Sequence, residues 1–161
     1  MFDRLRPWVG GAVLEIGSGI GNLSTFLLDA KRLVLTDTRE EYLNRLRQRF
    51  AQCANVSVER LYLPNEHAAL AGQRFDTIIC LNVLEHVDDD IGSLVAIRGM
   101  LAADGRLVLL VPALPALYGT MDRALGHHRR YTRRGLGDVF RQTGFRLAHI
   151  EYFNLAGVPG W

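Results

Sequence analysis

Three glycines alternate at positions 17, 19 and 21, directly after a short apolar run that contains one carboxylate, Glu15. Because glycine has no Cβ and adopts positive φ, such a turn lets a ligand lie against the backbone. Where a glycine turn leads into a helix, free backbone N–H groups point at whatever binds there. The stretch 13–23 therefore predicts a ligand site, with a phosphate loop or a tight turn without ligand as the alternatives.

A second carboxylate, Asp37, follows the next apolar run, twenty residues after Gly17. At the end of the second strand of a Rossmann-like fold, a carboxylate accepts hydrogen bonds from ribose hydroxyls. The alternative is a cap for the following helix, but Thr38 and Glu41 already have the spacing of a capping box. We therefore predict that Asp37 binds a ribose, with Thr38 beside it.

Polar side chains gather again after a third apolar run, at Asn82, Glu85 and His86. The carboxyl end of a central parallel strand is where α/β folds bind ligands. We predict a ligand site here, in which Glu85 contacts the substrate and His86 is a candidate general base. The alternative is that Asn82 hydrogen-bonds a loop and His86 packs at a helix start.

A basic segment, residues 127–134, contains two histidines and four arginines. Arginine presents a planar fork that suits phosphate or carboxylate, so the segment is a candidate anion site, with a solvated basic loop as the alternative. We predict substrate contacts from Tyr118, Arg129, Arg130 and Tyr131. His127 and His128 are the further candidates for a general base, and we expect His128→Ala to lower turnover without weakening cofactor binding. The sequence predicts no set of metal ligands.

The elements that position these residues alternate between strands and helices. Strands are expected at 12–16, 32–36, 56–61, 77–82, 106–111 and 145–152. Helices are expected after the glycine turn (core face Leu23, Phe26, Leu27 and Ala30), after Thr38, after Asp88–Asp90 and after Thr132. This order predicts an α/β doubly wound, mostly parallel sheet with helices on both faces.

Two motifs together resemble those of the class I S-adenosylmethionine-dependent methyltransferases, in particular small-molecule methyltransferases. The first is Glu15-x-Gly17-x-Gly19-x-Gly21, and the second is the block from Phe75-Asp76 to Asn82-Val-Leu-Glu-His-Val87. The resemblance implies S-adenosyl-L-methionine as cofactor and S-adenosyl-L-homocysteine as product. It places the glycine turn against the amino-acid part of the cofactor and Glu15 below it. The residues that it implies as cofactor contacts are Gly17, Ser18, Gly19, Gly21 and Asn22 of the turn and Asn82, Val83 and Leu84 of the second motif.

The resemblance also marks two departures and suggests a class of acceptor. The usual acidic residue after the third strand is missing, which leaves Asn65 or Glu66 as candidates to contact adenine. We also expect the sheet to lack the family's final seventh strand or to be truncated before it. The segment Gly126-His-x-Arg-Arg-Tyr-Thr132 resembles one methyltransferase subgroup whose relatives often sit beside or within glycosyltransferases. It therefore implies a small-molecule, glycan or lipid-linked acceptor, including anionic ones, and an association with a glycosyltransferase.

Composition excludes several other classes of protein. At 161 residues the chain fits one domain, with a lead-in over 1–11, a cofactor-binding half over 12–111 and a substrate-side half over 112–161. A net charge of +2 is too small to indicate nucleic acid, which is the weaker option because the basic segment is short and lacks a distinct binding module. The two cysteines, 53 and 80, are too far apart for a C-x-x-C zinc or redox motif. With no signal peptide or membrane-spanning run, a cytoplasmic protein is expected.

The predicted function is methyl transfer, in which the protein aligns the acceptor with the methyl group, excludes water and uses a histidine base where the acceptor is a hydroxyl. One alternative is a non-catalytic methyltransferase-like binding domain. The other is an NAD(P)-dependent oxidoreductase, against which Asn22 counts because it stands where the dinucleotide fingerprint has its third glycine.

Overall fold

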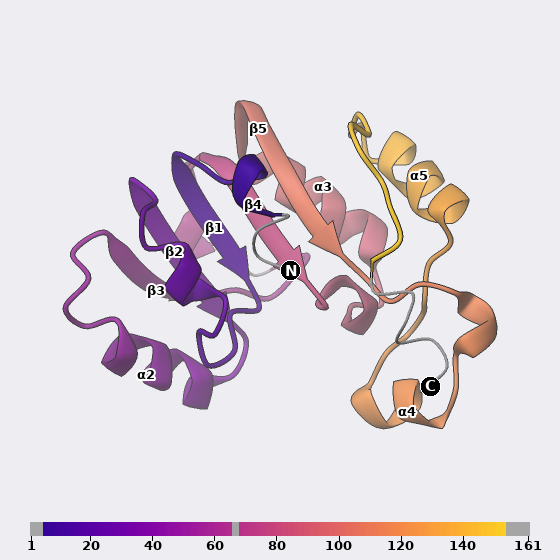
Figure 1. Ribbon diagram of the computed structural model, residues 1–161, viewed down its shortest axis with the longest axis horizontal. Helices are drawn as coiled ribbons and strands as arrows, with labels where there is room; N and C mark the ends of the chain where they lie inside the picture. The colour runs from indigo at the N-terminus through magenta and orange to yellow at the C-terminus, as the bar shows by residue number, and fades with distance from the viewer. Residues whose placement is uncertain (1–4, 66–67, 154–161) are drawn as a thin grey trace.

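The computed structural model describes residues 5–65 and 68–153, and its centre is a five-stranded parallel sheet (Figure 1). The strands are β1 (Ala12–Ile16), β2 (Arg32–Asp37), β3 (Val56–Arg60), β4 (Phe75–Leu81) and β5 (Leu101–Leu110). Their order in the sheet is β3-β2-β1-β4-β5, so the direction of winding reverses between β1 and β4. Open α/β sheets bind ligands at such a reversal, beyond the carboxyl ends of the strands.

Helices cover both faces of this sheet, as predicted. Successive strand residues point to opposite faces. Val13 and Ile79 pack with Leu46 of α2 (Glu40–Arg49) on one face. On the other face Leu14 and Ile78 belong to the core cluster formed with α3 (Asp90–Met100) and α5 (Arg133–Gln142). The predicted doubly wound fold is confirmed.

Short elements complete the described chain. Six residues form α4 (Thr120–Leu125), which the sequence did not predict. Single 3-10 turns form η1 (Arg6–Trp8), η2 (Ser24–Phe26), η3 (Ala68–Leu70), η4 (Leu84–His86) and η5 (Pro115–Leu117). None of the helices in the described ranges is long and apolar enough to cross a membrane.

The predicted helix after the glycine turn is wrong. Only the 3-10 turn η2 forms between β1 and β2, and Phe26, expected in the core, is 57% exposed. The cause is Ser24, whose hydroxyl is fully buried and donates a hydrogen bond to the Glu15 carboxylate. That contact turns the segment toward β1 and leaves Leu27 as its buried apolar anchor.

Two further expectations about local structure are wrong. Thr38 does not cap α2, because the helix has Arg39 at its N-cap without a side-chain cap, and Asp37 Oδ1 instead accepts the Arg39 N–H at 3.0 Å. Residues 145–153 form no strand. There, Arg133 donates to the Ile150 carbonyl and stacks on Tyr152, contacts that hold the segment beside α5 rather than on β5. The expectation about a seventh strand concerns residues outside the described ranges.

Candidate active site

The glycine turn lies against the ends of β2 and β4. Gly17 has φ +74°, and a Cβ placed on it would lie 2.3 Å from Cγ2 of Val83, in the loop after β4. The Gly19 N–H donates to Asp37 Oδ2 at 3.0 Å, and the Ser18 N–H donates to the Thr36 carbonyl at 2.8 Å. The structure thus brings together three regions that the sequence predicted as parts of one site.

Glu15 lies beneath this turn and is buried. Its carboxylate accepts the Ser24 hydroxyl, and its backbone carbonyl accepts the hydroxyl of Thr36 at 2.8 Å. Burial is the main effect on this group and raises the pKa of Glu15 to about 7, although the hydrogen bonds from serine hydroxyls oppose it. The folded protein therefore keeps a proton on this carboxyl group at pH values where a solvent-exposed glutamate has lost it.

The raised pKa of Glu15 makes stability depend on pH. The folded protein binds this proton more tightly than the unfolded chain, so stability falls as pH rises from about 4.5 to about 7 and is then level. We expect Glu15→Gln to remove that fall. The free energy of unfolding of the variant, measured relative to that of the wild type, should therefore rise by up to about 3 kcal/mol between pH 5 and pH 8. Urea unfolding at both pH values measures this, with exposed Glu41→Gln as control. A difference between variant and wild type that is the same at both pH values would contradict the raised pKa of Glu15.

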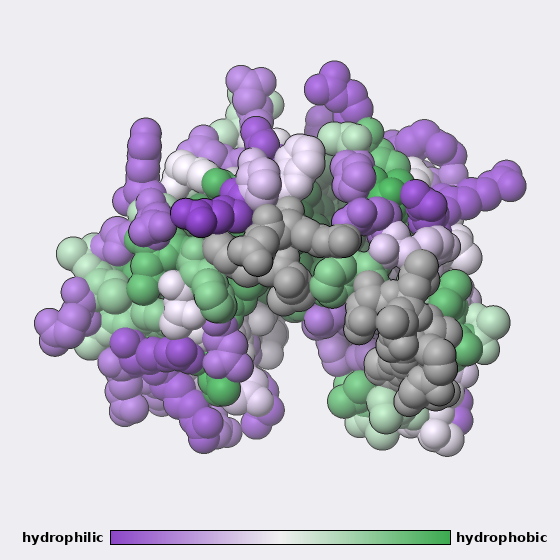
Figure 2. Space-filling view, in the orientation of Figure 1, coloured by the Kyte–Doolittle hydropathy of each residue, from purple (hydrophilic) through white to green (hydrophobic). Residues whose placement is uncertain are grey.

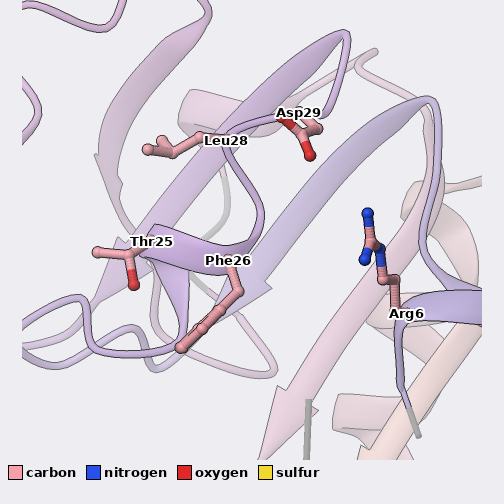
Figure 3. A pocket seen from close by; sticks show the side chains of 5 residues that line it. All are labelled: Arg6, Thr25, Phe26, Leu28 and Asp29. Carbon is pink, nitrogen blue, oxygen red and sulfur yellow. The ribbon is translucent and has the colours of Figure 1, made fainter. Parts of the chain in front are cut away.

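A hollow of about 270 Å³ opens at this turn, lined by Glu15, Ile16, Gly17, Ser18, Gly19, Ile20, Asn22, Leu23, Ile79 and Leu81. In Figure 2 a notch separates the lobe that carries α2 from the lobe that carries α4. Another hollow, of about 250 Å³, is lined by Arg6, Thr25, Phe26, Leu28 and Asp29. Figure 3 shows Arg6 of η1 facing Phe26 and Asp29 across it; no predicted site residue lines this second hollow.

Several predicted cofactor residues do not line the hollow, namely Gly21, Asp37, Thr38, Asn82, Val83 and Leu84. Gly21 is buried behind the turn, where a Cβ would lie 2.7 Å from the ring of Phe50. Thr38 is exposed beyond Asp37, and its carbonyl accepts the Tyr62 hydroxyl at 2.8 Å. Asn65, a candidate for adenine, is exposed, and Glu66 lies outside the described residues.

The loop after β4 carries the next predicted group. Asn82 has φ +53°, and its N–H donates to the Leu110 carbonyl at 2.9 Å, which fixes the point where the chain leaves the sheet. The turn η4 follows directly, with Leu84 and Glu85 buried and His86 exposed. The Glu85 carbonyl accepts the His128 N–H at 2.7 Å, so η4 and the basic segment lie side by side.

An ion pair that the sequence did not reveal organises the basic segment. Arg130 donates to Asp122 from Nε to Oδ1 at 2.8 Å and from Nη2 to Oδ2 at 2.9 Å, and both side chains are buried. Nδ1 of His127 lies 3.0 Å from the same Oδ1. The arginine hydrogen bonds hold the pKa of Asp122 well below its usual range. The sequence offered one indication of this pair, because Asp122 is the one acidic residue between the loop at 112–119 and Arg134.

The other predicted substrate residues are also held by internal contacts. Arg129 lies 3.0 Å from Asp90 and 3.4 Å from Asp88. The Tyr131 hydroxyl donates to Asp90 at 2.9 Å, and burial raises the pKa of Tyr131. Tyr118 donates to the His127 carbonyl at 2.7 Å. These partners position the segment beside η4 and neutralise part of the charge that suggested an anion site.

A family profile described as a methyltransferase domain matches residues 14–107, which is more than half of the chain and includes both the glycine turn and the β4 loop. The chain belongs to this family. The class I S-adenosylmethionine-dependent methyltransferase resemblance is thereby confirmed.

Named relatives of this methyltransferase domain agree. It is 31% identical over 101 residues to the magnesium-protoporphyrin O-methyltransferase of Synechocystis sp., and 31% identical over 107 residues to the ubiquinone biosynthesis O-methyltransferase of Haemophilus ducreyi. Each match covers 62% of this chain and 44% of the relative, so the chain spans less than half of these proteins. An S-adenosylmethionine-dependent methyltransferase structure from Mesorhizobium loti superposes with a TM-score of 0.77 and 21% identity, covering 99% of this chain and 88% of that one.

The residues of the methyltransferase domain fit the cofactor of its family. Val83 fills the space that a side chain at Gly17 would need, whereas nothing of the protein lies near the Cβ position of Gly19, and both glycines line the hollow. A ligand can therefore approach the backbone at Gly19. Asp37 is buried at the carboxyl end of β2 with both oxygens directed at backbone N–H groups of the site rim. Asp37 does not itself line the hollow, but its hydrogen bond from the Gly19 N–H places it beside a residue that does.

Proposed function

We propose that this methyltransferase domain binds S-adenosyl-L-methionine at the glycine turn and methylates a small molecule, with S-adenosyl-L-homocysteine as product. The observation that carries the proposal is the Gly19–Asp37 hydrogen bond, because it joins the glycine turn to the predicted ribose-binding carboxylate. Asp37 would accept ribose hydroxyls, Gly17, Ser18, Gly19 and Asn22 would line the amino-acid end, and Asn82, Val83 and Leu84 would flank the cofactor from β4. Gly21 would support the turn from behind, against Phe50, and Thr38 would lie beyond Asp37 at the edge of the site.

The bound cofactor supplies a sulfonium methyl group that is already a good electrophile. The protein therefore has to align the acceptor and keep water away. We propose that residues 12–111 bind the cofactor and that 112–161 build the acceptor wall, because Tyr118, Arg129 and Tyr131 all lie in a segment tied to η4.

We propose an oxygen atom as acceptor, since both curated relatives are O-methyltransferases. His128 is then a candidate general base: its side chain is 44% exposed, and its Nδ1 lies 3.6 Å from Asp88. His86 and His127 are the other two candidates. Within this class, anionic, glycan or lipid-linked acceptors and an associated glycosyltransferase follow only from the sequence resemblance of residues 126–132.

Calorimetric titration with S-adenosyl-L-homocysteine tests the proposal, with NADH titrated in parallel. We expect micromolar binding of the first, about 8 kcal/mol of binding free energy, and no binding of NADH. Binding of NADH alone would favour the oxidoreductase alternative. Binding of neither compound by a protein with a cooperative unfolding transition would contradict the proposed cofactor.

A further inference from the structure

Two side chains of η4 meet a third from a segment that is distant in the sequence. Glu85, His86 and His127 each offer one ligand atom, and these atoms all lie within 4.8 Å of one another. The rings of His86 and His127 stand nearly perpendicular with centroids 4.6 Å apart. Two imidazoles and one carboxylate form a ligand set that first-row divalent metals bind. We propose that Glu85, His86 and His127 form a site for a divalent transition-metal ion.

The Glu85 carboxylate provides an independent observation. Glu85 is only 1% exposed, yet no described residue gives its Oε2 a hydrogen-bond partner. A buried carboxylate oxygen without a partner carries the full cost of losing its water, on the order of 1–3 kcal/mol or more. A cation bound beside it removes that cost. The buried carboxylates Glu15 and Asp122 accept hydrogen bonds from Ser24 and Arg130, respectively, which sets Glu85 apart from them.

His127 is already oriented as a ligand. Its Nδ1 lies 3.0 Å from Asp122 Oδ1, and Arg130 holds that carboxylate by two hydrogen bonds. An ionised Asp122 accepts from Nδ1–H, so the lone pair is on Nε2. Metal-binding histidines commonly donate their other ring N–H to a carboxylate, which fixes the tautomer and the ring. This gives the buried Asp122–Arg130 pair a second role, as the positioning group of His127.

The backbone also fixes the distance between the two segments. A hydrogen bond of 2.7 Å from the His128 N–H to the Glu85 carbonyl joins the two segments directly beside the proposed ligands. A tetrahedral ion bound at 2.0–2.1 Å brings its ligand atoms to about 3.4 Å from one another. His86 is exposed, and its ring also hydrogen-bonds the backbone at Gly126 and Leu125, so closing the remaining gap would exchange one of these contacts for the metal. The same exposure leaves a coordination position open to water or to an acceptor.

The role of this ion rests on the proposed function. Val83 packs on Gly17, so η4 begins next to the glycine turn. A metal at η4 would bind the acceptor hydroxyl and lower its pKa, with His86 and His127 as ligands and His128 left as the candidate base. The hydroxyl proton would pass to His128 and from there to water, and the O–CH3 bond would form as the S–CH3 bond breaks, leaving a neutral thioether. The acceptor class is then a compound with a metal-binding oxygen, such as a phenol or a diol.

Titration of the cofactor-free protein with Co²⁺ tests the metal site, followed by the visible d–d absorption and by calorimetry at pH 7.5. We expect one ion per chain. His86→Ala and Glu85→Gln should each weaken binding at least tenfold, because each removes a ligand. His149→Ala is the matched control, since this histidine is 60% exposed and lies outside the cluster. Thermal unfolding verifies that each variant is folded.

Two results would overturn the metal site: no saturable binding up to about 1 mM Co²⁺, or an equal loss of affinity in His86→Ala and His149→Ala. Both are independent of the cofactor, because the titration contains none. Failure to bind S-adenosyl-L-homocysteine alongside tight Co²⁺ binding would instead count against the proposed function alone.

Discussion

Replacing Asp122 with alanine is expected to lower the free energy of unfolding by about 3 kcal/mol. Asp122 and Arg130 form a buried, doubly hydrogen-bonded pair, and removal of one partner leaves a buried charge uncompensated, a change that typically costs about 3–5 kcal/mol. We place the effect at the lower end because α4 belongs to a small lobe at the margin of the domain, where water can reach Arg130 after a modest shift (Figure 1). Urea unfolding of both proteins measures the difference.

The control for this prediction is Asp138→Ala, which also removes an aspartate that is paired with an arginine. Asp138 and Arg141 lie on the surface of α5, with side-chain exposures of 40% and 75%. Surface pairs contribute about 0–1 kcal/mol, so this variant should unfold almost as the wild type does. If both variants lose the same stability, the Asp122–Arg130 pair does not hold the lobe together.

The second large effect is expected on cofactor affinity. Asp37→Asn should weaken binding of S-adenosyl-L-homocysteine about 10- to 100-fold, because hydrogen bonds from ribose hydroxyls to a charged acceptor contribute about 1.5–3 kcal/mol. Asparagine keeps the volume of the side chain and one acceptor oxygen, so the bonds from the Gly19 and Arg39 N–H groups are only partly lost. Calorimetry measures affinity, and thermal unfolding measures stability.

Asp76→Asn is the matched control for Asp37→Asn. Asp76 also accepts a backbone N–H, from Ala12 at 2.7 Å, but it lies at the amino end of β4, away from the hollow. We expect this variant to bind S-adenosyl-L-homocysteine as the wild type does. If Asp37→Asn binds S-adenosyl-L-homocysteine with unchanged affinity, Asp37 does not bind the ribose.

Features set by local sequence were predicted well. The strands β1, β2 and β4 are short apolar runs, and the predicted cap Thr132 accepts the Gly135 N–H. The start of β5 was predicted less well, because this strand begins at Leu101, five residues before the expected position. The glycine turn and Asp37 were also found, since the carboxyl ends of adjacent parallel strands must meet. The two failed elements, a helix after the turn and a sixth strand, depend on side-chain contacts made by Ser24 and Arg133.

The substrate side was harder to predict because it depends on tertiary contacts. His86 and His127 are 41 positions apart, and nothing in their spacing indicates that their rings touch. The basic segment suggested an open anion site, whereas Arg130 is buried on Asp122. Residue types alone do not reveal which charges a fold has already paired.

The location of the cofactor is the central claim, and backbone amide resonances of the ¹⁵N-labelled protein test it most directly. On titration with S-adenosyl-L-homocysteine we expect the amides of Gly17, Gly19 and Asp37 to shift, while those of Gly99 and Gly137, in α3 and α5, stay unchanged. Saturable binding that leaves the glycine turn unshifted, or the absence of any shift at millimolar ligand, would contradict a cofactor site at the ends of β1 and β2.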